Sequence, residues 1–326
     1  MPEALDPHLA RIERVAFVAC GTSWHAALSG KTYVETLARL PVEVDIASEY
    51  RYRDPVLDER VLVVVVTQSG ETADTIAALR EARRRGAITL AITNAQGSMA
   101  TREAHATFLT KAGPEVGVAA TKTFTAQVAA AYLLALGLAE RRGTLPDLRA
   151  RIEDLLTLPH LVQSTIASLS GLRDLAVSFA GARDFLYLGR GILYPMALEG
   201  ALKLKEISYI HAEGYPAGEL KHGPIALIDP KMPIVALIGQ GVARDKMLSN
   251  VQEVRARGGI LVSVCHAGDE EARRLSDHVI EIPRSPELLS PFVAALPMQL
   301  FAYHLAVALS CDVDQPRNLA KSVTVE

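Results

Sequence analysis

Residues 61–72 read VLVVVVTQSGET, and this stretch decides the fold class of the chain. Its first six residues are apolar and mostly valine, which is typical of a strand covered on both faces of a parallel sheet. A polar turn with a glycine follows, and residues 71–85 then have the period of a helix that ends in arginines before Gly86. Strand, turn and helix in this order predict a βαβ unit.

The same pattern recurs along the chain in two sets. Strands are predicted at residues 15–19, 42–47, 61–66, 88–93 and 106–110, and again at 185–188, 234–238, 260–264 and 279–282. Helical stretches separate the strands, so the sequence predicts an α/β fold of two similar doubly wound units. Ligands of such sheets bind beyond the carboxyl ends of the strands, and the site is expected in the turns found there.

The length, charge and composition of the chain limit the classes of protein to which it can belong. The chain has 326 residues, which at about 150 residues per domain is enough for two buried cores. Its 34 Lys and Arg against 37 Asp and Glu give a net charge of -3, so no basic surface indicates a nucleic-acid partner. The composition is 49% apolar, which excludes a disordered chain.

Cysteine usage and the apolar segments favour a cytoplasmic protein without a membrane span. The three cysteines, an odd number at wide spacing, indicate neither a disulfide framework nor a metal site, and no targeting peptide opens the chain. Residues 291–309 are almost long enough to cross a bilayer, but Pro297, Gln299 and His304 interrupt them. We expect this segment to be a buried core helix.

Three hydroxyl side chains follow the strand at residues 61–66. Thr67, Ser69 and Thr72 can donate to an anion, Gly70 lets the anion approach the backbone, and the positive end of the next helix favours negative charge. The alternative is an ordinary helix cap, which needs one hydroxyl, stabilises the helix by about 1 kcal/mol and binds nothing. Residue patterns alone leave a phosphate site and a cap as open alternatives.

Known nucleotide-binding motifs are not matched. The chain has no GxxxxGK[ST] sequence, which excludes a nucleotide-hydrolysing P-loop. Gly189 and Gly191 are followed by Tyr194 where the dinucleotide fingerprint needs a third glycine, so a nicotinamide cofactor is not indicated. The first predicted strand also ends in hydroxyls, at Thr22 and Ser23, which adds to the candidate phosphate site.

A second candidate site lies on the helix that follows residue 191. Glu199, Lys203 and Glu206 are spaced by four and three residues, which places them on one helical face. Such a row is either a solvated stripe of weak ion pairs or, beside the polar loop that follows it, a catalytic group. The loop residues His211, Glu213, Glu219 and His222 match no familiar metal-ligand spacing, so no metal site is predicted.

Five motifs together carry a resemblance to a known family. They are CGTS at residues 20–23, QSGETADT at 68–75, EGALKLKEISYIHAE at 199–213, GELKHGP at 218–224 and DQPRNLAKSVTVE at 314–326. They resemble the sugar isomerase (SIS) domains, most closely the isomerase half of the amidotransferases that make glucosamine 6-phosphate, and they span essentially the whole chain. The resemblance implies two flavodoxin-like three-layer αβα subdomains, at residues 1–145 and 146–310, and an ordered active-site tail at 311–326.

The resemblance also assigns roles to individual residues. Lys321 would form a Schiff base with the ketose, Glu206 would move the proton between C1 and C2, His222 would assist ring opening from the partner subunit, and Lys203 would support the charge arrangement. The residues expected to hold the phosphate or the sugar are Thr22, Ser23, Thr67, Gln68, Ser69 and Thr72, with Val118 and Ala320 contributing their backbones. Related proteins often have Ser in place of Thr67 and Ala120, and Ala120 lacks the hydroxyl contact that a serine would make.

Substrates and partners are likewise implied by the resemblance. They are fructose 6-phosphate, with glucosamine 6-phosphate or, without ammonia, glucose 6-phosphate as product, and a second subunit in a homodimer with a shared active site. Neither a cofactor nor a metal is expected. The related enzymes have a glutaminase domain with a cysteine after the initial Met, whereas this chain begins Met-Pro, so we expect an excised isomerase domain. A stand-alone SIS deaminase or ammonia-dependent synthase, and a non-catalytic sugar-phosphate sensor, are the alternatives.

Overall fold

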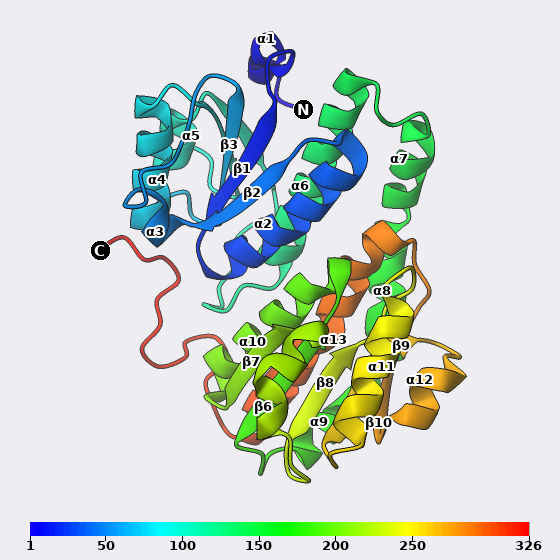
Figure 1. Ribbon diagram of the computed structural model, residues 1–326. Helices are drawn as coiled ribbons and strands as arrows, with labels where there is room; N and C mark the ends of the chain where they lie inside the picture. The colour runs from blue at the N-terminus through cyan, green and yellow to red at the C-terminus, as the bar shows by residue number, and fades with distance from the viewer. Residues whose placement is uncertain (326) are drawn as a thin grey trace. The chain divides into compact units, whose positions relative to one another are not determined.

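Residues 1–325 are described by a computed structural model, in which the chain divides into two units (Figure 1). The first unit comprises Met1–Ala150 and the chain from Ala320 onward, and the second comprises Arg151–Leu319. Glu326, the last residue of the tail motif, lies outside the described residues. Each unit is built around its own parallel sheet, and the two are described in turn.

The first unit contains a five-stranded sheet in the order β2-β1-β3-β4-β5, with every neighbouring pair parallel. The strands are β1 (Arg14–Ala19), β2 (Val42–Ile46), β3 (Val61–Thr67), β4 (Ile88–Thr93) and β5 (Ala106–Leu109). All five were predicted from the sequence, and each begins and ends within one residue of the prediction. This strand order is that of flavodoxin-like folds, as expected.

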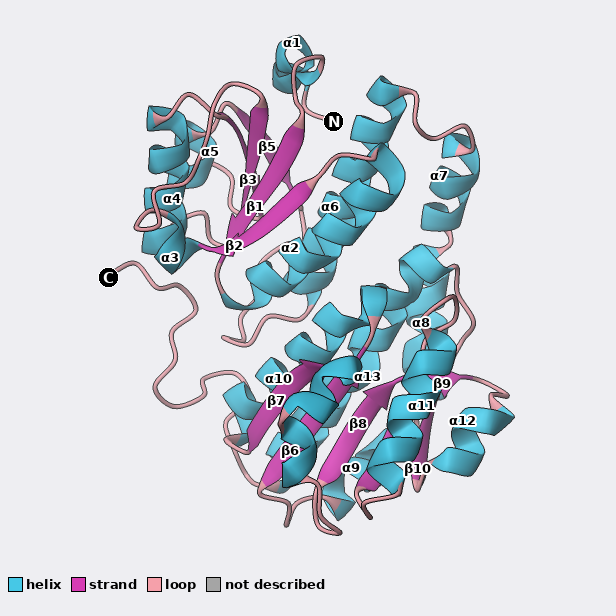
Figure 2. Cartoon of the chain, in the orientation of Figure 1, coloured by secondary structure: helices cyan, strands magenta, loops and turns pink. Residues whose placement is uncertain are grey.

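Helices cover both faces of this sheet (Figure 2). They are η1 (Glu3–Leu5), α1 (Asp6–Leu9), α2 (Gly21–Tyr33), a π-helical turn η2 (Val34–Ala38), α3 (Ala47–Tyr50), α4 (Ala73–Arg84), α5 (Met99–Glu103) and α6 (Lys122–Arg142). The helices α3, α4 and α5 lie on one face, and α2 and α6 lie on the other (Figure 1). The unit therefore has the three layers that the doubly wound pattern predicts.

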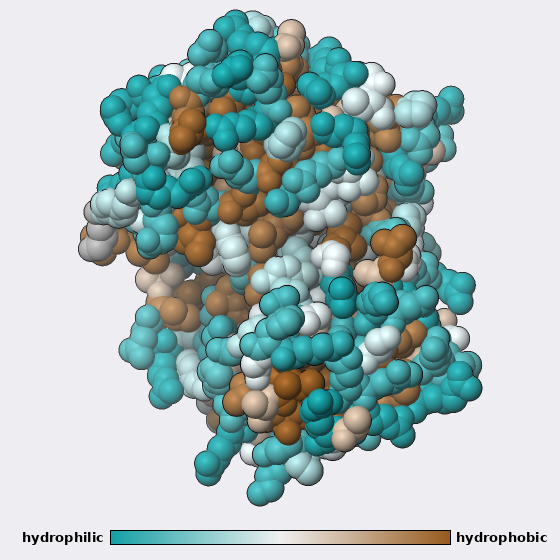
Figure 3. Space-filling view, in the orientation of Figure 1, coloured by the Kyte–Doolittle hydropathy of each residue, from teal (hydrophilic) through white to brown (hydrophobic). Residues whose placement is uncertain are grey.

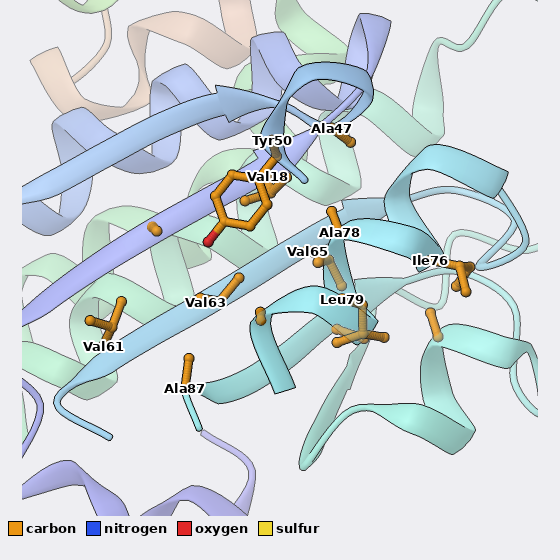
Figure 4. Close-up of a cluster of buried hydrophobic side chains, with 14 residues drawn as sticks. Val18, Ala47, Tyr50, Val61, Val63, Val65, Ile76, Ala78, Leu79 and Ala87 are labelled. Atoms are coloured by element: carbon orange, nitrogen blue, oxygen red, sulfur yellow. The ribbon is translucent and has the colours of Figure 1, made fainter. Parts of the chain in front are cut away.

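The apolar run at residues 61–66 is the centre of this unit. Val63 and Val65 of β3 point toward Ile76 and Leu79 of α4, with Tyr50 of α3 beside them (Figure 4). Each of these side chains is at most 3% exposed. Since burial of one such side chain contributes about 1.5–3 kcal/mol, β3 and α4 are held firmly together. The turn between them is thereby fixed in position.

The second unit repeats the topology of the first. Its parallel sheet has the order β10-β9-β8-β6-β7, which becomes the order of the first sheet when read from β7. The strands are β6 (Asp184–Gly189), β7 (His211–Pro216), β8 (Pro233–Leu237), β9 (Ile260–His266) and β10 (His278–Ile282). The predicted duplication is confirmed.

One strand of this sheet was not predicted. Residues 211–216 were assigned to a polar loop, but they form β7, which pairs in parallel with β6 from His211 to Pro216. The strand lies at the edge of the sheet, and only Ala212 of its six residues is fully buried. Because Gly214 and Pro216 are unfavourable in strands and the apolar residues are few, neither periodicity nor propensity indicated it.

Helices also cover both faces of the second sheet. They are α8 (Leu158–Ser168), α9 (Leu172–Ser178), η3 (Gly191–Leu193), α10 (Tyr194–Ser208), η4 (Ala217–His222), η5 (Pro224–Leu227), α11 (Arg244–Arg255), α12 (Glu270–Leu275), η6 (Glu287–Leu289) and α13 (Ser290–Ala308). A further helix, α7 (Leu148–Leu156), carries the boundary between the two units. On one face, buried residues of α11 and α12 form a hydrophobic core with residues of β6, β8 and β9.

Two helices, α6 and α13, are long and apolar enough to cross a membrane by length and composition alone. Most of the residues in both are buried inside the protein, as in core helices of globular domains. The prediction of a buried core helix at residues 291–309 is thus confirmed by α13, which contains Pro297. Hydrophilic side chains dominate the face seen in Figure 3, where apolar side chains form separate patches.

Candidate active site

The carboxyl ends of β1 and β3 bring two hydroxyl-rich turns to the same edge of the first sheet. Ala19 at the end of β1 lies opposite Val66 of β3 in the parallel ladder. The turn after β1 leads directly into α2, on which Ser23 is 9% exposed, and the turn after β3 contains the predicted anion site at residues 67–72. The structure thus brings Thr22 and Ser23 to the edge where Ser69 lies.

The turn at residues 67–72, called the phosphate loop below, is held together by its own hydroxyls. Gly70 N donates to Thr67 Oγ1 at 3.2 Å, and Glu71 N donates to Ser69 Oγ at 3.1 Å. The hydroxyls of Thr67 and Thr72 are 3.2 Å apart. Because this turn uses Glu71 and Thr72, α4 begins at Ala73 rather than at residue 71 as predicted.

Gly70 is required by the shape of this loop. Its φ of +69° lies in the left-handed region. A Cβ at this position would be 2.0 Å from Ser98 Oγ, a buried side chain that donates to Ala95 O. Glycine at this position lets the loop pack directly on Ser98. That Gly70 also lets an anion approach the backbone stays a prediction.

The C-terminal tail returns to the phosphate loop. Ser322 Oγ donates to Ser69 Oγ at 3.0 Å. The next residue, Val323, accepts a hydrogen bond at its carbonyl from Ala73 N, the first residue of α4, at 3.0 Å. A segment that periodicity could not interpret is therefore fixed against the N-terminal end of the helix that follows the loop.

Lys321, the predicted Schiff-base residue, lies beside an acid that the sequence analysis missed. Its Nζ donates to Glu115 Oε2 at 2.7 Å and to Gly117 O at 2.8 Å. The lysine side chain is 27% exposed, whereas that of Glu115 is 6% exposed. Val118 follows Gly117 directly and Ala320 precedes Lys321, so both are next to this contact in the chain. That their backbones line the sugar stays a prediction.

Glu115 also anchors the start of α6. Its Oε1 accepts from Thr121 N at 2.9 Å and from Thr123 N at 3.3 Å, and its Oε2 accepts from the Thr123 hydroxyl. Burial alone would raise the pKa of this carboxyl, but the bonds from Lys321, Thr123 and Thr121 outweigh burial and lower it. Glu115 stands in an irregular segment far from Lys321 in sequence, so spacing gave no signal for it.

The row of charges on α10 is buried. Lys203 Nζ is 2.6 Å from Glu206 Oε2 and 3.3 Å from Glu199 Oε1. The side chains of Lys203 and Glu199 are 2% exposed and that of Glu206 is 21% exposed. Burial lowers the pKa of Lys203, but the two carboxylates outweigh it and the net pKa is raised. A solvated stripe, one alternative for this row, is wrong for Glu199 and Lys203.

His222 is exposed at the end of η4, in the segment that follows β7. Gly223 after it has a φ of 144°, so the chain turns sharply there. The predicted role of His222 in a partner's site concerns the dimer and stays a prediction. Among residues 1–325, no group of three or more His, Cys, Asp and Glu side chains could hold a metal ion.

The predicted site residues thus fall into two groups. The first unit brings together the phosphate loop, the tail with Lys321, and Glu115. The second unit brings together Lys203, Glu206 and Glu199, and carries His222 on a separate segment. The two groups differ in chemistry, because the first presents hydroxyls and an amine and the second a buried ammonium between carboxylates.

Comparison with known proteins gives consistent matches. The family model described as SIS domain matches residues 8–137 and 178–309. The glutamine–fructose-6-phosphate aminotransferase (isomerizing) of Thermus thermophilus is 53% identical over 325 residues, which are 99% of this chain and 54% of the relative. The enzyme of the same name from Mycobacterium leprae is 51% identical, over 98% of this chain and 52% of the relative. The chain spans about half the length of these curated relatives.

A solved structure matches over nearly the whole chain. It is the C-terminal domain of glucosamine-fructose-6-phosphate aminotransferase from Francisella tularensis, with a TM-score of 0.92 and 42% sequence identity. The match covers 95% of this chain and 89% of that domain. Because the family model matches two stretches of the chain and this solved domain is similar in sequence and structure, the chain belongs to the SIS domain family.

Proposed function

We propose that this chain is the isomerase domain of a glucosamine-6-phosphate synthase. It binds fructose 6-phosphate and catalyses ketose–aldose isomerisation through a Schiff base at Lys321 and proton transfer by Glu206. With a source of ammonia the product is glucosamine 6-phosphate, and without one it is glucose 6-phosphate. The names and the extent of the matched relatives support this proposal.

One observation carries the proposal, namely that Ser322, the tail residue next to Lys321, contacts the hydroxyl-rich loop. Lys321 and Ser322 are consecutive, and Ser322 contacts Ser69 of the phosphate loop at 3.0 Å. Consecutive Cα atoms are about 3.8 Å apart, so the backbone of Lys321 lies close to the loop. We propose that the loop and the amine contact the two ends of one hexose phosphate. A non-catalytic sensor would need the loop and would have no use for the amine.

The two reactive groups have separate roles. A free lysine has a pKa of about 10.4, so at neutral pH its ammonium exceeds its amine by about a thousandfold, and attack on a carbonyl needs roughly 4 kcal/mol of help. Enolisation needs one carboxylate that takes a proton from one carbon and returns it to the next. Glu206 suits this role, since the buried Lys203 at 2.6 Å holds its carboxylate in place.

Assembly and nitrogen supply follow from the same proposal. The relatives are about twice as long as this chain, and we propose that a glutaminase domain supplies ammonia in the intact protein. We further propose a cytoplasmic homodimer in which His222 of one subunit assists ring opening in the site of the other. The phosphate is assigned to Ser69, Thr72, Gln68 and the neighbouring hydroxyls.

The first test is covalent trapping. Incubation with labelled fructose 6-phosphate and sodium cyanoborohydride is expected to modify the tail peptide at Lys321, as read by mass spectrometry. Isomerase activity should vanish in Lys321→Ala and Glu206→Gln, whereas binding of the sugar phosphate persists. Lys205→Ala changes an exposed lysine on the same helix as Glu206 and serves as the matched control. Turnover without any modified tail peptide would exclude the Schiff base.

The second test addresses the shared site. In a mixture of His222→Ala and Glu206→Gln subunits, one site of each hybrid dimer would have both groups intact. Random mixing should therefore restore about a quarter of the activity, since half of the dimers are hybrids and half of their sites are complete. Hybrids that are verified by mass and remain inactive would exclude a histidine acting from the partner.

A further inference from the structure

Glu115 has two oxygens with different surroundings. Its Oε1 is held by two backbone N–H groups at the start of α6, Thr121 N and Thr123 N. Its Oε2 faces Lys321 Nζ at 2.7 Å and accepts from the Thr123 hydroxyl. The carboxylate is thus clamped at one oxygen and presents the other to the lysine, with 6% of its side chain exposed.

The proposed function leaves the protons of Lys321 without an acceptor. An ammonium has no lone pair, so it must lose a proton before it can attack a carbonyl. The hydroxyl that forms on the former carbonyl carbon must then gain a proton to leave as water. Glu206 is assigned to the proton that moves between carbons, so a different group is needed at nitrogen.

We propose that Glu115 is the acid and base catalyst of the Schiff base at Lys321. The inference rests on the proposed function, since it gives Glu115 a catalytic role only if Lys321 attacks the ketose. Glu115 is a catalytic residue in this reaction because it touches the reacting nitrogen. Neither the sequence motifs nor their spacing indicated it.

The proton balance of the step is complete. Glu115 Oε2 takes one proton from the ammonium, the amine forms a bond to C2, and the electron pair of the C=O bond moves to oxygen. A second proton passes from nitrogen to that oxygen and gives the carbinolamine. Glu115 then returns its proton to the hydroxyl, the C–O bond breaks as water leaves, and the nitrogen lone pair forms the protonated imine. The carboxylate is regenerated, and no other reactant is needed.

Among the described residues of the first unit, the other groups bonded to Lys321 Nζ or next to it in the chain cannot act as this acid and base. Gly117 O, at 2.8 Å, accepts a hydrogen bond but does not take up a proton near neutral pH. The hydroxyl of Ser322 is directed at Ser69. The pKa of Glu115 is lowered, so at neutral pH it is ionised and ready to accept. Its clamped Oε1 keeps Oε2 in place through the reaction.

A purely structural role for Glu115, as an anchor of α6 and the tail, makes a different prediction. Three variants separate the two roles. Glu115→Gln keeps an oxygen for the backbone N–H groups but cannot carry a proton. Thr123→Val removes one donor to Oε2 and loosens the anchor, yet it keeps the carboxylate. Glu140→Gln changes an exposed acid at the other end of α6 and serves as the matched control.

The experiment measures how fast labelled fructose 6-phosphate is trapped on the tail peptide, at saturating cyanoborohydride, in the 326-residue chain. Glu115→Gln is expected to trap about a hundredfold more slowly, the usual contribution of one acid and base group, with an unchanged half-saturating sugar concentration. Glu140→Gln should remain close to the unmodified chain, and Thr123→Val should lose far less than Glu115→Gln because it keeps the carboxylate. Glu115→Asp, which keeps a carboxylate, should recover part of the rate.

Two outcomes would overturn the inference. One is a trapping rate in Glu115→Gln equal to that of the unmodified chain. The other is an equal loss in Glu115→Gln and Thr123→Val, or in the Gln and Asp variants, which would indicate anchoring alone. Absence of any adduct in the unmodified chain is a separate result, because it rejects the Schiff base itself and with it the proposed function.

Discussion

The two sheets have the same strand order, yet the turns at their corresponding edges differ. In the first unit the turn after β3 contains Thr67, Ser69 and Thr72, and the tail contacts it at Ser69. In the second unit the turn after β8 contains Gly239, Gln240 and Gly241 and offers no hydroxyl. The same topology therefore presents a hydroxyl-rich turn in one unit and a turn without hydroxyls in the other.

The corresponding space in the second unit is partly filled. A Cβ at Gly239 would be 2.9 Å from Leu193 Cδ1, and one at Gly241 would be 2.4 Å from the Glu287 carboxylate. The remaining cavity of about 80 Å³ is lined by Arg190 and Arg244. Both arginines are engaged, by Asn250 at 2.9 Å and by Asp269 at 2.7 and 2.9 Å respectively. A carboxylate beside the turn disfavours an anion, so the fold fixes where a ligand can bind and the turn decides whether one does.

The largest effect is expected on stability, when a glycine in each turn is replaced by alanine and the two losses are compared. In Gly70→Ala the new Cβ meets buried Ser98 at 2.0 Å, and the φ of +69° is unfavourable for alanine. We expect the free energy of unfolding to fall by about 3 kcal/mol, since strain at positive φ and overpacking add. Gly241→Ala meets the movable end of Glu287 and should lose about 1 kcal/mol from φ alone.

Urea unfolding measures both variants. Fluorescence of Trp24, the one tryptophan of the chain, reports the first unit, and far-UV circular dichroism reports both. Gly70→Ala should also lose binding of fructose 6-phosphate, whereas Gly241→Ala keeps it. Equal losses of stability in the two variants would contradict the difference drawn between the two turns.

A smaller effect is expected from removing hydroxyls without changing the backbone. Ser69→Ala combined with Thr72→Ala should weaken fructose 6-phosphate binding by about 2–3 kcal/mol, because one hydrogen bond to a charged group contributes about 1.5–3 kcal/mol net and the Thr72 hydroxyl is already paired with that of Thr67. Binding of fructose, which has no phosphate, should change far less. Titration calorimetry with both sugars provides the measurement.

The matched control for this pair is Gln240→Ala, at the corresponding turn of the second unit. It should leave the dissociation constants of both sugars unchanged. If the double variant weakened fructose and fructose 6-phosphate by the same factor, the loop would contact the sugar and the phosphate would bind elsewhere. If Gln240→Ala weakened the phosphate selectively, the second turn would be the anion site.

Periodicity and turn chemistry predicted the fold more fully than the site. The strand β3 is buried on both faces, has a long apolar run and was predicted within one residue. The edge strand β7 has little buried surface and was missed, because its stability comes from pairing with β6. The turn at residues 67–72 could be named as a candidate anion site because its hydroxyls lie within six residues of sequence, and binding of phosphate there stays a prediction. Glu115 was missed because its contact with Lys321 joins positions that only the folded chain brings together.

The smallest effect is expected on the pH dependence of stability. It concerns the strands β4 and β9, which lie next to β3 and β8 in their sheets. Thr93 ends β4 and donates to Gln68 O of the phosphate loop at 3.3 Å, whereas β9 ends at His266, whose Nδ1 is 3.0 Å from Pro283 O. His266 is 5% exposed, and burial lowers its pKa more than the bond to Pro283 raises it. The two strands therefore differ in that only β9 ends in a buried group that titrates.

An unfolded histidine has a pKa of about 6.5, so between that pH and the lower folded value the unfolded chain binds a proton that the folded chain does not. This contribution to stability is present above about pH 6.5 and is lost as the pH falls, by at most about 1.4 kcal/mol per pH unit. Urea unfolding at pH 7.5 and 5.5 should therefore show a smaller acid loss in His266→Asn than in the unmodified chain. Thr93→Val, which removes no titrating group, should lose as much as the unmodified chain, and an equal acid loss in all three proteins would exclude His266 as a source of acid sensitivity.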